Sequence, residues 1–412
     1  MTRQYSFDKS RINVLLLEGL DPGAEATFRA AGYDHVDCVT HALAPDALAD
    51  AVANAHLIGI RSRTQLTADV LARADRLIAV GCFCIGTNQV DLDAARRRGI
   101  PVFNAPFSNT RSVAELVLAE AVLLLRGIPA RDRLIKQGIW RKSAEHAYEI
   151  RGKTLGVIGY GNIGAQLGVL AEAMGMHVVY HDIVKKLNLG NAAAVEDLRD
   201  LLAMSDVVSL HVPATADTDH LIGARELAMM KPTAVLINAS RGCVVDLDAL
   251  ADALRHGRLL GAAIDVYPEE PTSNQSDEPF RTPLHECPNV ILTPHIGGST
   301  QEAQANIALE VAEKLVRYSD NGSTMTAVNF PEVALSEHPG THRLLHIHRN
   351  EPGVLSRINT VFSDMNANVA AQYLQTRDDV GYVVIDLDAE DSAPALEGLQ
   401  RIEATIRTRV LF

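Results

Sequence analysis

The stretch Val-Ile-Gly-Tyr-Gly-Asn-Ile-Gly at residues 157–164 decides the fold of this chain. It overlaps a short apolar run, residues 154–158, of the kind that forms a buried parallel strand. Gly159 allows a tight turn, Gly161 lets backbone N–H groups approach a pyrophosphate at a helix N-terminus, and Gly164 permits close packing of that helix on the strand. Glycines in this arrangement after a strand predict a dinucleotide-binding turn.

A carboxylate follows at the end of the next predicted strand. Residues 165–174 indicate a helix, and residues 177–181 indicate the second strand. Asp182 then lies where a carboxylate accepts hydrogen bonds from the hydroxyls of an adenosine ribose, and its charge repels a ribose 2′-phosphate. The sequence therefore predicts NAD rather than NADP as cofactor, a preference that Lys185 and Lys186 weaken a little.

Composition and charge exclude several classes of protein. With 412 residues, 47% of them hydrophobic, the chain is long enough for two or three domains. Its net charge of −13 argues against a nucleic acid or an anionic membrane as partner. No run approaches the roughly 18 uncharged apolar residues that span a bilayer, and the apolar run within residues 1–20 is too short for a signal peptide.

The cysteines indicate a reducing compartment. They form an odd, sparse set without the spacing of a disulfide framework: Cys38, Cys82, Cys84, Cys243 and Cys287. Cys82 and Cys84 suggest a metal or redox pair, but no further ligand lies near them in the sequence, and burial at a strand end is the favoured interpretation. We therefore expect free thiols, no metal site and a cytoplasmic location.

Two series of strands and helices precede a tail of a different kind. Apolar runs alternate with helical stretches over residues 11–107 and again over 154–297, which predicts two parallel-sheet α/β lobes, Rossmann-like or flavodoxin-like, with a cleft between them. Residues 337–412 follow the order βαββαβ, which predicts a ferredoxin-like domain. We expect a substrate-binding lobe at 1–108, completed by 299–336, a nucleotide-binding domain at 109–298 and the tail domain at 337–412.

The individual strands are predicted from short apolar runs. In the two lobes they include residues 57–60, 77–80, 177–181, 235–238 and 290–292. In the tail we expect strands at 344–348, 369–375, 382–387 and 408–412, with helices at 352–365 and 393–404.

Three side chains of different chemistry follow predicted strands of the second lobe, where open α/β sheets bind their ligands. A hydride transfer between NAD and a 2-hydroxy acid needs a cation for the carboxylate and an acid/base for the hydroxyl proton. It also needs a carboxylate that sets the tautomer of a histidine and raises its pKa. Arg241, His295 and Glu270 fit these roles in that order.

Each of these residues also has an ordinary structural explanation. A strand-end arginine such as Arg241 is usually a solvated charge, and Thr-Pro-His at 293–295 is often only a turn. Glu269 and Glu270 are adjacent, and spacing alone does not decide which of them faces the cleft. The combination after a nucleotide-binding turn favours the catalytic interpretation.

Four segments together resemble the D-isomer-specific 2-hydroxyacid dehydrogenases: residues 159–164, 238–242, 261–266 and 293–300. The resemblance covers essentially the whole chain. With segments 82–88 and 108–115 and an ACT-like tail, the chain is similar to the short bacterial members of this family that act on 3-phosphoglycerate. The resemblance implies NAD-dependent oxidation of 3-phospho-D-glycerate to 3-phosphohydroxypyruvate, the first step of L-serine synthesis.

The resemblance also implies roles for individual residues. Arg241, Glu270 and His295 form the catalytic set. The resemblance favours Glu270 over Glu269, because the family's glutamate immediately precedes a proline, as Glu270 precedes Pro271. The cofactor contacts are Gly159, Gly161, Asn162, Ile163, Gly164, Asp182, Ala239, Ser240, Arg241, Asp265, His295, Ile296, Gly297 and Gly298.

Arg61 and Arg63 match the family's basic pair for the substrate phosphate. At alternate positions of an extended segment, both point into a cleft only where the strand twists or ends. Trp140 and Lys142 match a segment that reaches the active site of a neighbouring subunit, which implies a homo-oligomer, most simply a tetramer. The alternative for Trp140 is packing in the core.

The tail resembles a domain that pairs with its mate across a two-fold axis and binds serine as a feedback inhibitor. His348, Asn350 and Asn368 match the serine-binding positions, and such side chains suit a zwitterion. Two departures from the family's pattern concern how tightly the substrate and serine are bound. Residues 10–135 contain no lysine where the family often has a phosphate contact, and His342 stands where arginine is more usual.

Two other functions remain open from the sequence. One is reduction of another 2-oxo acid, such as 2-oxoglutarate to 2-hydroxyglutarate, with loose phosphate selectivity. The other is a non-catalytic NAD-sensing protein on a dehydrogenase scaffold, against which the complete set Arg241, Glu270 and His295 argues.

Overall fold

The computed structural model describes residues 9–271, 279–337, 342–388 and 392–411. The chain divides into two compact units, residues 1–108 together with 304–412, and residues 109–303. The domain ranges expected from the sequence stay a prediction, because this division places the tail in the same unit as the first lobe.

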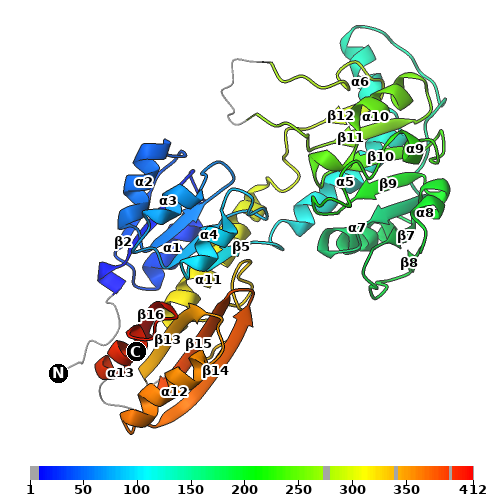
Figure 1. The fold of residues 1–412 in the computed structure, drawn as a ribbon. Helices are drawn as coiled ribbons and strands as arrows, with labels where there is room; N and C mark the ends of the chain where they lie inside the picture. Colours follow the sequence, from blue (N-terminus) through cyan, green and yellow to red (C-terminus); the bar gives the residue numbers. More distant parts are fainter. Residues whose placement is uncertain (1–8, 272–278, 338–341, 389–391, 412) are drawn as a thin grey trace. The chain divides into compact units, whose positions relative to one another are not determined.

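The first unit contains a five-stranded parallel sheet, drawn in blue to cyan in Figure 1. Its strand order is β2-β1-β3-β4-β5. This is the flavodoxin-like order. Its strands are β1 (Asn13–Leu16), β2 (His35–Cys38), β3 (Leu57–Ile60), β4 (Ala79–Cys82) and β5 (Val102–Asn104). Its helical segments are η1 (Lys9–Arg11), α1 (Pro22–Ala30), α2 (Pro45–Asn54), α3 (Ala68–Ala72) and α4 (Leu92–Arg97). β4 begins two residues later than predicted because Leu77 is held in a turn, its N–H donating to the Ala74 carbonyl.

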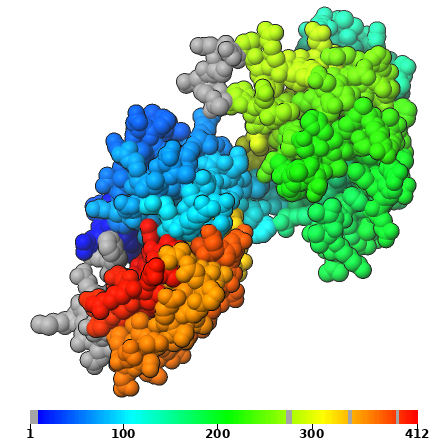
Figure 2. Space-filling model, in the orientation of Figure 1, coloured from blue at the N-terminus to red at the C-terminus, as the bar shows by residue number. Residues whose placement is uncertain are grey.

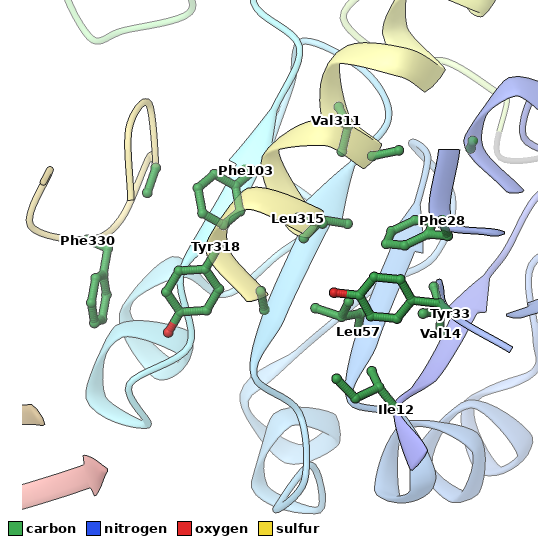
Figure 3. Packing of buried hydrophobic residues seen from close by; sticks show 14 of the residues in the cluster. Ile12, Val14, Phe28, Tyr33, Leu57, Phe103, Val311, Leu315, Tyr318 and Phe330 are labelled. Atoms are coloured by element: carbon green, nitrogen blue, oxygen red, sulfur yellow. The ribbon is translucent and has the colours of Figure 1, made fainter. Parts of the chain in front are cut away.

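One long helix, α11 (Gln301–Asn321), supplies much of the apolar core of this unit. Val311, Leu315 and Tyr318 of this helix are fully buried, and the Tyr318 and Phe103 ring centroids are 5.9 Å apart (Figure 3). A Cβ at Gly81 of β4 would be 2.7 Å from side-chain atoms of Val311 and Leu315. Only glycine lets the sheet and this helix approach so closely.

The tail forms a four-stranded antiparallel sheet in the order β14-β15-β13-β16. Its elements are β13 (His342–Arg349), α12 (Val354–Asp364), β14 (Val369–Arg377), β15 (Val380–Leu387), α13 (Ala393–Gln400) and β16 (Thr405–Leu411). The predicted βαββαβ order is confirmed. The end of the second helix was predicted wrongly: it ends at Gln400 rather than 404, and the last strand begins at Thr405.

The tail sheet and the first lobe share one apolar cluster. Leu345, Ile347 and Tyr382 belong to the same cluster as the core of the first lobe. Arg343, with 1% of its surface exposed, forms a bidentate ion pair with Asp386 at 2.6 and 2.7 Å. β14 is the edge strand at one end of this sheet, and most of its residues are exposed. The orange part of the tail domain, to which β14 belongs, forms part of the surface in Figure 2.

The second unit contains a seven-stranded parallel sheet in the order β12-β11-β10-β9-β6-β7-β8. Counted from β6, its first six strands have the Rossmann order 3-2-1-4-5-6. Its strands are β6 (Thr154–Ile158), β7 (His177–His181), β8 (Ala193–Ala194), β9 (Val207–Leu210), β10 (Val235–Asn238), β11 (Gly261–Ile264) and β12 (Val290–Leu292). Its helical segments are α5 (Thr110–Leu125), α6 (Ile128–Lys136), α7 (Asn162–Ala173), α8 (Leu198–Met204), α9 (Ala224–Leu227), η2 (Gly242–Val244) and α10 (Leu247–Arg255).

The fold class predicted from the sequence is therefore confirmed for both parallel sheets and the tail. Among the described residues, no helix has the length and apolar character needed to cross a membrane. None of the five cysteines forms a disulfide, and the described part of the chain holds no cluster of His, Cys, Asp or Glu suited to a metal ion.

Candidate active site

The glycine turn between β6 and α7 has the backbone that the sequence predicted. Gly159 has a φ of 90°, and a Cβ there would overlap the carbonyl of His211. A Cβ at Gly164 would overlap the carbonyl of Gly159, so the helix packs on the turn without a side chain between them. By contrast, a Cβ at Gly161 would meet nothing within 4 Å. The open space at Gly161 lies at the N-terminus of α7, where first-turn N–H groups have no intrahelical partner.

Asp182 is held against this turn. Its Oδ2 accepts a hydrogen bond from the Tyr160 N–H at 2.9 Å, and its Oδ1 accepts one from the Val184 N–H at 2.8 Å. The carboxylate is thereby fixed next to the turn, where its remaining lone pairs suit ribose hydroxyls. The open helix N-terminus and the oriented carboxylate fit NAD, which supplies the hydride acceptor when bound.

His295 and Glu270 form a hydrogen-bonded pair. His295 Nδ1 lies 2.8 Å from Glu270 Oε2 and 3.1 Å from Oε1. A proton on Nδ1 is then donated to the carboxylate, which leaves Nε2 for the hydroxyl of a substrate. The N–H of Tyr267 donates to Glu270 Oε1 at 3.1 Å and helps to fix the carboxylate. His295 adopts a φ of 54°, uncommon for a residue other than glycine.

The pKa values of His295 and Glu270 are both shifted in the direction that keeps each residue charged. The hydrogen bond to Glu270 raises the pKa of His295, against the opposing effect of partial burial and of the nearby Arg241. For Glu270, burial alone favours the neutral acid, but the hydrogen bonds from His295 and Tyr267 outweigh it and lower its pKa. A histidine with a raised pKa holds a proton near neutral pH, as an acid for ketone reduction requires.

Arg241 is placed near this pair by two contacts of its own loop. The Asn238 side chain binds both ends of the loop: its Nδ2 donates to the Arg241 carbonyl at 3.0 Å, and its Oδ1 accepts from Ser240. Gly242 packs directly on the backbone of Tyr267, where any Cβ would overlap the carbonyl. The loops that carry Arg241 and Glu270 are thus held against each other.

Asp265 organises the loop that carries His295. With 2% of its surface exposed, it accepts hydrogen bonds from Thr293 Oγ1, the Ile296 N–H and the Gly297 N–H at 2.7, 2.8 and 2.8 Å. Its own carbonyl accepts from the His295 N–H at 2.8 Å. The cofactor contact predicted for Asp265 and its neighbours stays a prediction, but these residues shape the histidine loop through the hydrogen bonds above.

Glu120, a buried acid of α5, was not predicted from the sequence. Glu120 has 2% of its surface exposed, and neither carboxylate oxygen has a hydrogen-bond partner among the described residues. Burial, followed by the charge of Asp265, raises its pKa to about 8. The only signal in the sequence was a glutamate within a strongly apolar helical run.

The predicted substrate residues lie in different parts of the chain. Arg61 and Arg63 follow β3 in the first unit, whereas the three predicted catalytic residues belong to the second. Trp140 and Lys142 belong to an exposed segment after α6, and Trp140 has 82% of its surface exposed. Packing of Trp140 in the core, the alternative considered from the sequence, is therefore wrong.

The three predicted effector residues do not lie together in one chain. His348 pairs with Gly381 at the start of β15, and Asn350 binds the Asp378 carbonyl at 3.2 Å near the same end. Asn368, however, precedes the pair Val369–Leu387 at the other end of β15. The two ends are separated by about 20 Å, at roughly 3.4 Å per strand residue.

Comparisons with known proteins agree with this architecture. Residues 118–297 match the family model described as D-isomer specific 2-hydroxyacid dehydrogenase, NAD binding domain, and residues 344–407 match an AHAS small subunit-like ACT domain. D-3-phosphoglycerate dehydrogenase of Haemophilus influenzae is 57% identical over 412 residues and 100% of both chains. The protein of the same name from Dictyostelium discoideum is 49% identical over 99% of both chains.

Solved structures give the same relationship for the catalytic part. The structure of D-lactate dehydrogenase from Aquifex aeolicus, complexed with NAD and lactic acid, is 30% identical to this chain with a TM-score of 0.65. The match covers 74% of this chain and 95% of that one. A glyoxylate reductase from Paecilomyes thermophila is 27% identical, with a TM-score of 0.66 over 77% of this chain and 98% of that one.

Proposed function

The chain belongs to the D-isomer-specific 2-hydroxyacid dehydrogenase family, and from this premise we propose that it oxidises 3-phosphoglycerate to 3-phosphohydroxypyruvate with NAD, at the start of serine synthesis. The observation that carries the chemistry is the bond between His295 Nδ1 and Glu270 Oε2, with Arg241 held beside it. Identity of 57% to relatives named for this reaction supports the choice of substrate.

Each catalytic residue has one task in this proposal. Arg241 binds the substrate carboxylate, for which a guanidinium offers paired donors. Nε2 of neutral His295 takes the proton of the C2 hydroxyl as the hydride leaves C2, and returns it in the reverse reaction. Glu270 holds the imidazole in the tautomer with a proton on Nδ1 and stabilises the cation that forms.

Arg61 and Arg63 bind the substrate phosphate. Neither guanidinium forms an ion pair with a carboxylate in the described part of the chain, so both charges are available to an anion. A dianionic phosphate gains more from two such charges than a carboxylate does. We propose 2-oxoglutarate, with a carboxylate in place of the phosphate, as a weaker side substrate that is reduced to 2-hydroxyglutarate.

A homo-oligomer, which we propose to be a tetramer, would bury the exposed segment that carries Trp140. This segment and α6 line a hollow of about 410 Å³. Two apolar residues of its lining, Ile135 of α6 and Ile139 of the segment, are 48% and 45% exposed. A large aromatic side chain exposed beside apolar neighbours is typical of a protein–protein contact. In this proposal Trp140 and Lys142 reach the active site of a neighbouring copy.

The same reasoning supports serine as the effector bound between two tail domains. Because Asn368 lies at the opposite end of β15 from His348 and Asn350, one small amino acid cannot contact all three within one chain. Two chains with their β14 edges together would bring the two sets into one site. Serine binding there would be coupled reciprocally to binding at the active site.

A steady-state assay with NADH tests the proposal. Purified protein should reduce 3-phosphohydroxypyruvate with a much higher kcat/KM than 2-oxoglutarate, and serine should inhibit the reaction. A kcat/KM that favours 2-oxoglutarate would overturn the substrate assignment, whereas turnover that does not respond to serine would overturn the regulatory half alone.

A further inference from the structure

Glu18 holds the loop that carries Arg61 and Arg63 by the backbone. Its Oε1 accepts hydrogen bonds from the N–H groups of Arg61 and Thr64 at 3.1 and 2.9 Å, and its Oε2 accepts one from the N–H of Arg63 at 3.1 Å. One carboxylate thus binds the N–H groups of both arginines and of the residue that follows them. Bonds from N–H groups to an ionised acceptor are stronger than bonds between neutral groups.

The strand order explains why Glu18 can reach this loop. β1 and β3 are neighbours in the sheet with Leu16 opposite Gly59, so the chain leaves both strands at the same edge. Glu18 comes two residues after β1, and Arg61 comes directly after β3. A carboxylate at the first exit is therefore within reach of the backbone at the second.

The backbone of Glu18 adopts a conformation that its side chain does not favour. Its φ is 68°, in the left-handed region that residues with a Cβ rarely adopt. Its N–H donates to the His41 carbonyl at 3.3 Å, and the next residue, Gly19, also has a positive φ, 60°. Such conformations persist where surrounding contacts over-determine them, and here the contacts are those that direct the carboxylate to the arginine loop.

Gln89 holds the same loop from the other side. Its Nε2 donates to the Arg61 carbonyl at 2.7 Å, and Gln89 is 3% exposed. Its own carbonyl accepts from the Leu66 N–H at 2.9 Å, at the far end of the loop. The backbone of residues 61–66 is thus fixed by Glu18 and Gln89, while the two guanidiniums remain outside these contacts.

The use of a carboxylate here has an electrostatic consequence. Among the described residues, Glu18 forms no ion pair with Arg61 or Arg63. Its carboxylate oxygens instead accept hydrogen bonds from backbone N–H groups. Three convergent N–H groups would otherwise form an anion-binding nest of their own. Since Glu18 fills that nest, an incoming phosphate meets the guanidiniums rather than the backbone.

We infer that Glu18 is a positioning residue for recognition of the substrate phosphate: it fixes the backbone of the loop so that Arg61 and Arg63 present their guanidiniums together. This inference rests on the proposed role of those arginines. It predicts that Glu18 acts on the affinity for the phosphorylated substrate and not on hydride transfer or on binding of NADH.

The test compares Glu18→Ala and Glu18→Gln with the parent protein and with Glu25→Gln. Glu25 is a matched control because its carboxylate pairs with Arg29 on α1, at 2.7 Å, and does not bind the loop. Glu18→Ala should raise KM for 3-phosphohydroxypyruvate about tenfold or more, with kcat and KM for NADH nearly unchanged. Glu18→Gln keeps one acceptor oxygen and should restore part of the affinity.

The arginines separate failure of this inference from failure of the proposed function. If Arg61→Ala/Arg63→Ala leaves KM for 3-phosphohydroxypyruvate unchanged, the phosphate assignment fails and the role of Glu18 with it. If that variant raises KM but both Glu18 variants leave KM within twofold of the parent or lower it, only the inference about Glu18 is overturned. In the double-arginine background, Glu18→Ala should cause no further loss, and a full additional loss would also overturn it.

Discussion

Gly242 lies against the backbone of Tyr267 so closely that no Cβ fits between them. This contact joins the loop of Arg241 to the loop of Glu270, because Tyr267 donates its N–H to the Glu270 carboxylate. The residue after the arginine is therefore glycine for a packing reason. The relative position of Arg241 and the pair formed by His295 and Glu270 depends on this contact.

Replacing Gly242 with alanine should push the two loops apart. We expect a loss of about 1–3 kcal/mol in the free energy of unfolding, typical of overpacking, together with a large drop in kcat/KM. Urea unfolding and steady-state kinetics measure the two effects. Gly223→Ala is the control, since a Cβ there meets its nearest atom at an ordinary 3.5 Å. Equal behaviour of the two variants would refute the packing argument.

Glu270→Gln should move the pH dependence of the reaction to lower pH. The Glu270 hydrogen bond raises the pKa of His295, so its removal lets that pKa fall. Ketone reduction requires the protonated imidazole, and its alkaline limb should therefore shift downward. Oxidation requires the neutral imidazole, so its acidic limb should shift in the same direction. Profiles of kcat/KM against pH in both directions provide the check, and an unshifted profile would exclude Glu270 as the cause.

Glu120 should destabilise the protein as the pH rises. Its pKa is about 8 in the folded chain against an ordinary 4.5, so the unfolded chain binds fewer protons between these values. The free energy of unfolding, taken relative to that of Glu120→Gln, should decline by a total on the order of 4 kcal/mol between about pH 4.5 and pH 8. Above pH 8 it should level off. Denaturant unfolding of both proteins at pH 5 and pH 9 measures this difference. Glu115→Gln, at an exposed position of the same helix, should show no such trend.

Asp182→Ala should weaken the choice of cofactor. The carboxylate lies at the glycine turn, and its charge repels a 2′-phosphate. Its loss should therefore raise KM for NADH about tenfold. The preference for NADH over NADPH should fall by about the same factor. The ratio of kcat/KM for the two cofactors is the quantity to compare. A ratio that does not change on substitution would argue against an Asp182 contact with the ribose.

Much of the fold could be predicted because its strands are short apolar runs in a regular order. The ranges 57–60, 177–181, 235–238 and 290–292 match strands of the structure residue for residue. The boundary in the tail was wrong because residues 401–404, which include Ile402 and Ala404, continue an apolar pattern in a turn rather than in a helix.

The sequence predicts site residues where a side chain would act through its own chemistry, as we propose for His295 and Asp182. Residues that bind backbone leave no such pattern. Glu18, whose carboxylate binds the N–H groups of a loop more than forty residues away, follows from the pairing of β1 with β3 and not from spacing. The separation of Asn368 from His348 likewise depends on the register of β14 against β15, which sequence distance does not reveal.

The most direct test of the central claim is the turnover of His295→Ala with 3-phosphohydroxypyruvate and NADH. The account predicts that kcat falls by about 10²- to 10⁴-fold, while the affinity for NADH, measured by its fluorescence, falls far less. A variant that reduces the substrate at the parent rate would contradict the assignment of His295 as the acid/base of this dehydrogenase.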